Sequence, residues 1–125
     1  MTTWTDDELS RIAAADELEI APLRGDGTLR RPTTIWVVRH DDDLYVRSYK
    51  GRRGHWFRAA QARHEGHISS GGVDRDVSFV EETDPSLHPA LDDAYRTKYH
   101  RYGGTYVDPM VAPDAQAATL RLVPR

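Results

Sequence analysis

The segment from residue 31 to residue 58 has the hydrophobic pattern of two β-strands joined by a short acidic turn. Its first strand is apolar on both faces, with Ile35 and Val37 on one and Trp36 and Val38 on the other. Apolar residues on both faces are typical of a strand inside a closed or double-layered sheet. The pattern therefore predicts a hairpin whose strands are buried on both sides.

The rest of the chain alternates between short strand patterns and helix patterns. Period-two alternation predicts further strands at residues 17–23, 67–70, 75–82 and 118–123. Helical spacing and capping signals, which include a capping-box pattern of Thr5 and Glu8 and an N-cap at Asp84, predict helices at residues 5–15, 54–64 and 84–102. Residues 104–117 are rich in proline and alanine, and we expect them to form a connection. With the hairpin, the count is six strands and three helices.

Short strands that follow one another through turns favour a largely antiparallel sheet. A doubly wound sheet would need a helix between most of its strands, which this order does not supply. We therefore predict an α+β fold, with a small six-stranded β-barrel and flanking helices. A chain of 125 residues corresponds to a single domain, residues 1–125.

Composition narrows the class of protein. The chain has no cysteine, which excludes disulfide bonds, thiol catalysis and thiolate metal sites. A net charge of −3 argues against general nucleic-acid binding. The sequence contains no apolar run long enough to cross a membrane and no apolar export signal near its start, so we expect a cytoplasmic protein.

The loop after the second strand of the hairpin has the chemistry of a phosphate site. Ser48 offers a hydroxyl, Lys50 a point charge, and Arg52 or Arg53 a planar guanidinium. Gly51 would let backbone N–H groups approach phosphate oxygens closely. The same composition also fits a solvated basic loop, and composition alone does not choose between the two.

Three residues that precede the neighbouring strand, Arg31, Thr33 and Thr34, are placed to contribute from the adjacent edge. Trp56 and Phe57 open the helix that follows the loop. We expect one of these two aromatic residues to pack in the core and the other to be available to line a ring-binding pocket.

Other motifs carry no specific chemistry. The two histidines of His64–His67 lie too close in sequence for the helical metal-binding motif, so no metal site is predicted. The aspartates of the hairpin turn, residues 41–43, are typical turn residues. No nucleophile elbow, Walker loop or dinucleotide glycine pattern occurs, and the pattern singles out no catalytic residue.

Taken in order, these motifs resemble a known group of proteins. The glycine turn at residues 24–27, the Arg/Thr-bearing strand, the Ser-x-Lys-Gly loop and the aromatic pair resemble the flavin split barrels. That group includes pyridoxamine-phosphate-oxidase-like proteins and deazaflavin-dependent, nitroreductase-like reductases. Within it, the chain is most similar to the family called domain of unknown function 2255. The resemblance spans residues 17–102 and implies a split barrel that is a homodimer.

The resemblance also implies a cofactor, FMN or a deazaflavin, and roles for several residues. Ser48 and Lys50 match positions that hold the cofactor phosphate, and Thr33 and Thr34 match the strand that faces the cofactor. Trp56 matches the aromatic residue that opens the helix. The cofactor-binding residues expected on this basis are Arg31, Thr33, Thr34, Arg47, Ser48, Lys50, Gly51, Arg52 and Trp56. Arg47 or Arg39 is expected to stabilise the anionic reduced ring.

The chain departs from the family pattern in the loop after the hairpin. Gly51-Arg52-Arg53 stands there where the family has a pair of glycines. The function implied is a flavin- or deazaflavin-dependent oxidoreductase-like protein that transfers a hydride to or from a small-molecule substrate. Two alternatives remain: a cofactor carrier without turnover, and a cofactor-free small-molecule-binding protein or enzyme on a split barrel that has lost the flavin site. No nucleic acid or membrane partner is expected.

Overall fold

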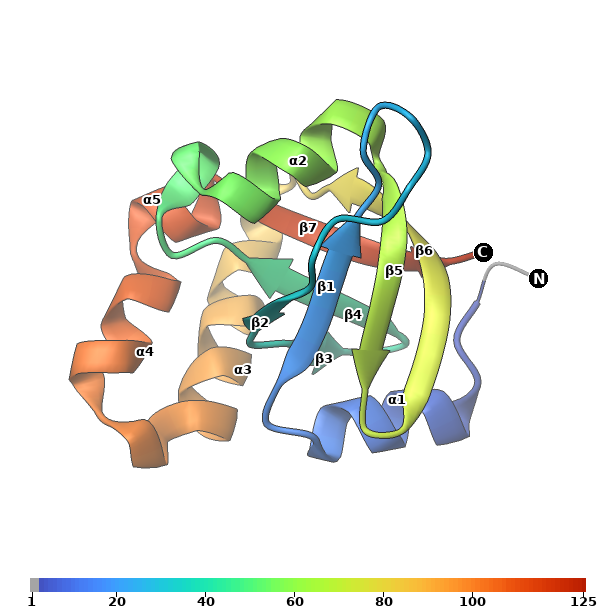
Figure 1. The fold of residues 1–125 in the computed structure, drawn as a ribbon. Helices are drawn as coiled ribbons and strands as arrows, with labels where there is room; N and C mark the ends of the chain where they lie inside the picture. Colours follow the sequence, from blue (N-terminus) through green and yellow to red (C-terminus); the bar gives the residue numbers. More distant parts are fainter. Residues whose placement is uncertain (1–2) are drawn as a thin grey trace.

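The computed structural model describes residues 3–125 as a seven-stranded sheet with helices on its outside (Figure 1). The strands are β1 (Leu18–Pro22), β2 (Thr33–Ile35), β3 (Val38–His40), β4 (Asp43–Arg47), β5 (Glu65–Ser70), β6 (Val73–Glu81) and β7 (Thr119–Pro124). The α-helices are α1 (Asp6–Ala14), α2 (His55–Arg63), α3 (His88–Tyr99), α4 (Gly104–Val111) and α5 (Pro113–Gln116). Short 3₁₀ helices lie at Gly51–Arg53, Pro85–Leu87 and His100–Tyr102.

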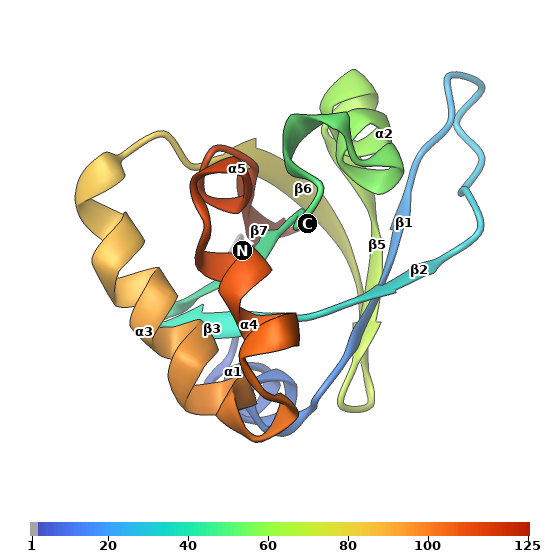
Figure 2. The same ribbon diagram turned by 90° about the vertical axis from the view of Figure 1, so that its left-hand side faces the viewer.

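The connection between two strands closes the sheet into a barrel. The strand order is β2-β1-β5-β6-β7-β4-β3, and every pairing between neighbours is antiparallel. β2 and β3 are consecutive in the chain but lie at opposite edges, with only Trp36 and Val37 between them. Because two residues bridge at most about 11 Å between flanking Cα atoms, the sheet must curl until its edges approach each other. Figure 2 shows this curvature. The prediction of an antiparallel split barrel with flanking helices is confirmed, with seven strands instead of six.

Two hydrophobic clusters lie on opposite sides of the barrel wall. The larger cluster fills the barrel and includes Val37, Leu44 and Val46. The second lies between the wall and helices α3 and α4 and includes Val38 and Tyr45. Neighbouring residues therefore belong to different clusters, which confirms the prediction of a hairpin buried on both faces.

The long first strand expected for the hairpin is divided. β2 pairs with β1, whereas β3 pairs with β4, so the chain leaves one edge of the sheet and joins the other at Trp36 and Val37. A continuous apolar run does not reveal such a change of partner, because both halves remain strand-like.

The expectation that residues 104–117 form only a connection is wrong, because this segment forms α4 and α5. Helix α4 contains Pro109, which opposes helix formation in the absence of other contacts. Val107 and Met110 of α4 are buried in the second cluster, and this tertiary burial outweighs the weak local preference.

The remaining helices follow their sequence signals. At α1, Thr5 and Glu8 form the predicted capping box, in which each side chain accepts a hydrogen bond from the other's backbone. Asp84 caps the turn before α3 by accepting from the Ser86 N–H at 2.9 Å. No helix within residues 3–125 is both long enough and apolar enough to cross a membrane.

Candidate functional site

A cavity of about 630 Å³ opens beside the split in the barrel. Its wall comes from four places: strand β2 with Trp36, the end of β4 with the loop after it, the start of α2, and one face of α4. The lining residues are Thr33, Thr34, Ile35, Trp36, Arg47, Ser48, Tyr49, Lys50, Gly54, His55, Trp56, Thr105, Tyr106, Pro109 and Met110. None of these residues is acidic, although the chain has twenty aspartates and glutamates. The cavity therefore favours an anionic ligand.

Ser48 presents a hydroxyl at the base of the cavity. The residue is 2% exposed, but its Oγ is reached by solvent and makes no hydrogen bond with another residue in the part of the chain described. Gly54 allows this placement, because a Cβ there would lie 2.4 Å from Ser48 Oγ. A larger residue at position 54 would displace the hydroxyl. The sequence thus places glycine where the Ser48 side chain needs room.

The amino end of α2 also faces the cavity. Its N-cap residue is Gly54, which supplies no side-chain cap, and His55 and Trp56 line the wall. The first N–H groups of a helix lack intrahelical partners and carry the positive end of the helix dipole. Together with Ser48 and the ammonium group of Lys50, this helix end forms a donor-rich corner suited to a phosphate.

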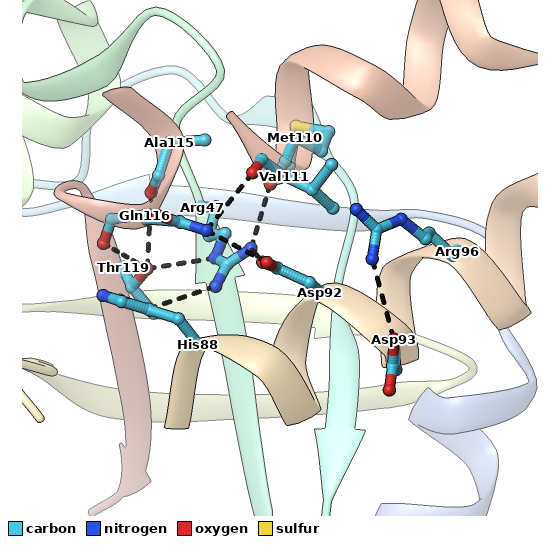
Figure 3. Close-up of polar contacts among 10 residues, drawn as sticks. All are labelled: Arg47, His88, Asp92, Asp93, Arg96, Met110, Val111, Ala115, Gln116 and Thr119. Atoms are coloured by element: carbon cyan, nitrogen blue, oxygen red, sulfur yellow. Dashed lines mark hydrogen bonds and ion pairs between the residues drawn. The ribbon is translucent and has the colours of Figure 1, made fainter. Parts of the chain in front are cut away.

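Arg47 lines the cavity, but its guanidinium is hydrogen-bonded to other groups of the protein. Its side chain is fully buried and donates to Asp92 Oδ1 at 2.5 Å, to the Met110 carbonyl at 3.0 Å and to Thr119 Oγ1 at 3.1 Å. Figure 3 shows Arg47 enclosed by groups from α3, α4 and β7. This charge is therefore not available to a ligand ring, and the expected role of Arg47 there is not supported.

The Arg47 network explains the position of α4. Arg47 caps the Met110 carbonyl, and Gln116 Nε2 donates to the Val111 carbonyl at 3.3 Å and to Asp92 Oδ2 at 3.0 Å (Figure 3). The buried guanidinium of Arg47 and the half-buried amide of Gln116 thus satisfy carbonyls at the carboxyl end of the helix, where a cation is favourable. The network holds α4 against the barrel and so fixes one wall of the cavity.

Six of the nine residues expected at the cofactor line this cavity: Thr33, Thr34, Arg47, Ser48, Lys50 and Trp56. Phe57 is fully buried in the barrel core, so the two neighbouring aromatic residues divide as expected. The hydroxyl of Thr34 donates to Glu19 at 2.6 Å. Thr33 has no such partner among the described residues, so its hydroxyl is the more available of the two.

The other three expected residues, Arg31, Gly51 and Arg52, do not line the cavity. Gly51 packs against Asp114, and a Cβ at position 51 would lie 3.2 Å from the Asp114 Cβ. Arg52 donates to Glu81 at 2.7 Å, and this bond lowers the pKa of the Glu81 carboxyl. We therefore leave these three residues out of the proposed site. Arg39 is also outside it, since its Nε donates to the Asp41 carbonyl at 2.8 Å.

Sequence reasoning missed the contributions of α4 and of Trp36. Thr105, Tyr106, Pro109 and Met110 come from the segment predicted to be a connection. The apolar spacing of Val107 and Met110 was a weak helical signal there. Trp36 was expected only as a strand residue, and no local pattern marks it as part of a cavity.

Comparison with known families identifies the group to which the chain belongs. The family described as "Uncharacterized protein conserved in bacteria (DUF2255)" matches residues 8–122. The chain belongs to this family. No curated protein matches the chain.

Solved structures place this DUF2255 member among the split barrels. One similar structure is named "F420 Reductase", with 20% identity, a TM-score of 0.56, and coverage of 93% of this chain and 90% of that chain. A putative pyridoxamine 5'-phosphate oxidase from Listeria innocua is 9% identical, with a TM-score of 0.62 and coverage of 96% and 90%. An FAD-binding protein from Mesorhizobium loti is 14% identical, with a TM-score of 0.57 and coverage of 98% and 89%. At these identities the comparisons establish the fold, which is the predicted split barrel.

Proposed function

We propose that this DUF2255 protein binds a flavin or a deazaflavin in the cavity and acts as an oxidoreductase-like protein on a small-molecule substrate. The observation that carries the proposal is the cavity itself, in which aromatic walls and a donor-rich corner occur together without any carboxylate. The names of the similar structures, which include an F420 reductase and an FAD-binding protein, support the same class of ligand.

The residues present fit such a cofactor. A volume of about 630 Å³ lies within the roughly 300–1,000 Å³ of typical small-molecule sites. Trp36, Trp56 and Tyr106 provide aromatic surface for a planar ring. Ser48 lines the cavity, and its Oγ makes no hydrogen bond with another described residue, so its hydroxyl is free to donate to a phosphate.

Each part of the site has a separate task in this proposal. Lys50, the Ser48 hydroxyl and the amino end of α2 hold the phosphate. The aromatic walls orient the ring and keep water from one side of it. The cofactor, when bound, supplies hydride transfer, and the protein supplies its binding, its orientation and its electrostatic surroundings. Tyr106 and Tyr49 are the two tyrosines at the cavity, and their hydroxyls are available for hydrogen bonds to a substrate.

Replacing Lys50 by alanine tests the phosphate corner. We expect Lys50→Ala to weaken the binding of FMN and of F420 about tenfold, because one charge-assisted contact is lost. The affinity is measured by following cofactor fluorescence during titration with protein. Arg58→Ala is the matched control, because it removes the same charge from an exposed position of α2 outside the cavity lining. Equal affinity in Lys50→Ala and the wild type would remove Lys50 from the site.

We also propose that the protein is a homodimer, with the second copy beside the cavity. Tyr49 and Tyr106 line the cavity and are 59% and 65% exposed. Exposed aromatic surface of this kind is characteristic of interfaces. Light scattering measures the molar mass in solution directly, and a mass of 14.2 kDa at all concentrations would contradict the proposal.

A second candidate is a cofactor-free small-molecule binder on the same scaffold. The observation in its favour is Gly51, which packs on Asp114 and leaves the cavity without the glycine backbone expected at the phosphate. This candidate gains support if neither FMN nor F420 binds at high micromolar concentration.

A further inference from the structure

Trp36 lies where the barrel splits. It and Val37 are the two residues between the edge strands β2 and β3, and neither belongs to a strand. The backbone groups of Val37 therefore need partners from outside the sheet. Helix α3 supplies them: the Val37 N–H donates to the Tyr99 hydroxyl at 3.1 Å, and the Val37 carbonyl accepts from Lys98 Nζ at 2.7 Å.

The same tyrosine supports the ring of Trp36. The Tyr99 and Trp36 rings are parallel, with centroids 3.9 Å apart. The Tyr99 hydroxyl also donates to the Asp16 carbonyl at 2.7 Å, which fixes the tyrosine from its far end. Tyr99 is fully buried, and this burial raises the pKa of its hydroxyl and keeps it neutral. One face of the indole is thus covered and held, while the remaining surface of Trp36 lines the cavity.

We propose that Trp36 is the stacking surface for a planar, electron-poor heteroaromatic ring, and that Tyr99 is the positioning residue that holds Trp36 against the cavity. This inference rests on the proposed function and adds which residue receives the ring and what kind of ring it is. The electron-rich face of an indole attracts flat, electron-poor rings in offset-stacked geometry. A saturated ligand of equal volume would gain no such contact.

The anchoring favours recognition of the ring. A side chain that is already fixed by its neighbours loses little conformational freedom when a ligand packs on it. Lys98 contributes to the anchor while half-buried, and burial lowers its pKa to about 8. Tyr102 adds a third aromatic ring, tilted by 35° and 5.5 Å from Trp36.

The test uses FMN, F420 and lumiflavin, a flavin ring without a phosphate. We expect Trp36→Leu to weaken the binding of all three ligands about tenfold, which is the upper end of the contribution of an aromatic pair. We also expect this variant to lose much of the quenching of flavin emission on binding, because stacked indole quenches an excited flavin. Trp36→Phe retains an aromatic face and should keep most of the affinity. Thermal unfolding of each variant checks that it is folded.

Two further variants separate stacking by Trp36 from stacking by Trp56 and from positioning by Tyr99. Trp56→Leu removes the other tryptophan of the cavity and should leave more quenching than Trp36→Leu does. Tyr99→Phe keeps the ring stack but loses the hydroxyl that anchors Val37 and Asp16. We expect it to weaken the binding of lumiflavin several-fold. We also expect it to shift the part of the tryptophan emission that Trp36→Leu abolishes, at a temperature where thermal unfolding shows the variant to be folded.

The outcomes distinguish the two proposals. If wild-type protein binds FMN or F420 and Lys50→Ala weakens binding, but Trp36→Leu binds as the wild type does, the function stands and the stacking surface is wrong. Loss of quenching in Trp56→Leu instead of Trp36→Leu would assign the ring to Trp56 and overturn the inference. If the wild type binds none of the three ligands, the proposed function fails and this inference fails with it.

Discussion

Replacing Asp92 by asparagine is expected to lower the free energy of unfolding by about 3–5 kcal/mol, because it leaves the buried charge of Arg47 without a counter-charge. Arg47 is fully buried, and Asp92 is its nearest acidic group at 2.5 Å. Asparagine has the same size as aspartate, so the decrease in the free energy of unfolding comes from the lost charge and not from a cavity. Denaturant unfolding monitored by circular dichroism measures the change.

Asp93→Asn is the matched control, because it changes the adjacent residue of the same helix. Asp93 pairs with Arg96 at 3.6 Å, and both side chains are more than half exposed (Figure 3). Such surface pairs contribute little to stability, and we expect Asp93→Asn to change the free energy of unfolding by no more than about 0.5 kcal/mol. Equal effects of the two substitutions would contradict a buried Arg47–Asp92 pair. The double variant Arg47→Met with Asp92→Leu removes both charges and should be more stable than Asp92→Asn.

Replacing Gly66 by alanine is expected to lower the free energy of unfolding by about 1–3 kcal/mol through overpacking between strands β1 and β5. A Cβ at this position would lie 2.5 Å from the Ala21 carbonyl oxygen and 2.8 Å from Pro22 Cα. Both are backbone atoms of a paired strand, so relief requires movement of β1 and not of a flexible side chain.

Gly25→Ala is the control for this substitution, since a Cβ there would meet nothing within 4 Å. We expect Gly25→Ala to leave the denaturant midpoint close to that of the wild type. A loss of stability as large as that of Gly66→Ala would show that the general cost of replacing glycine, and not the contact with β1, explains the effect.

Local patterns predicted the elements whose signals lie within a few residues of each other. The capping box of Thr5 and Glu8 and the doubly buried hairpin both formed as expected. In each of these, the interacting groups are close in sequence or alternate with a fixed period, so a single sequence contains the necessary information.

Features that depend on distant partners were not predictable. Arg47 looked like a ligand-binding cation, but its partner Asp92 lies 45 residues away on α3. The stacking of Trp36 on Tyr99 joins the split in the barrel to the same helix, and no spacing rule connects them. Helix α4 forms because its apolar residues are buried and its carbonyls are capped by Arg47 and Gln116.

In the candidate site, too, local patterns were predictable and contacts with distant partners were not. The loop after β4 could be predicted because Ser48 and Lys50 are adjacent to a clear strand end. The orientation of the next residues could not be predicted, because it depends on distant partners. Gly51 packs against Asp114 of α5, and the guanidinium of Arg52 donates to Glu81. Composition pointed to a segment that lines the cavity, and tertiary contacts decided which of its residues face it.

The most direct measurement is the titration of wild-type protein against FMN and F420, followed by cofactor absorbance and fluorescence. We expect saturable binding of at least one of the two, with about tenfold weaker binding in Lys50→Ala and no change in Arg58→Ala. The absence of binding of either compound at high micromolar concentration, in a protein shown to be folded, would contradict the proposed function.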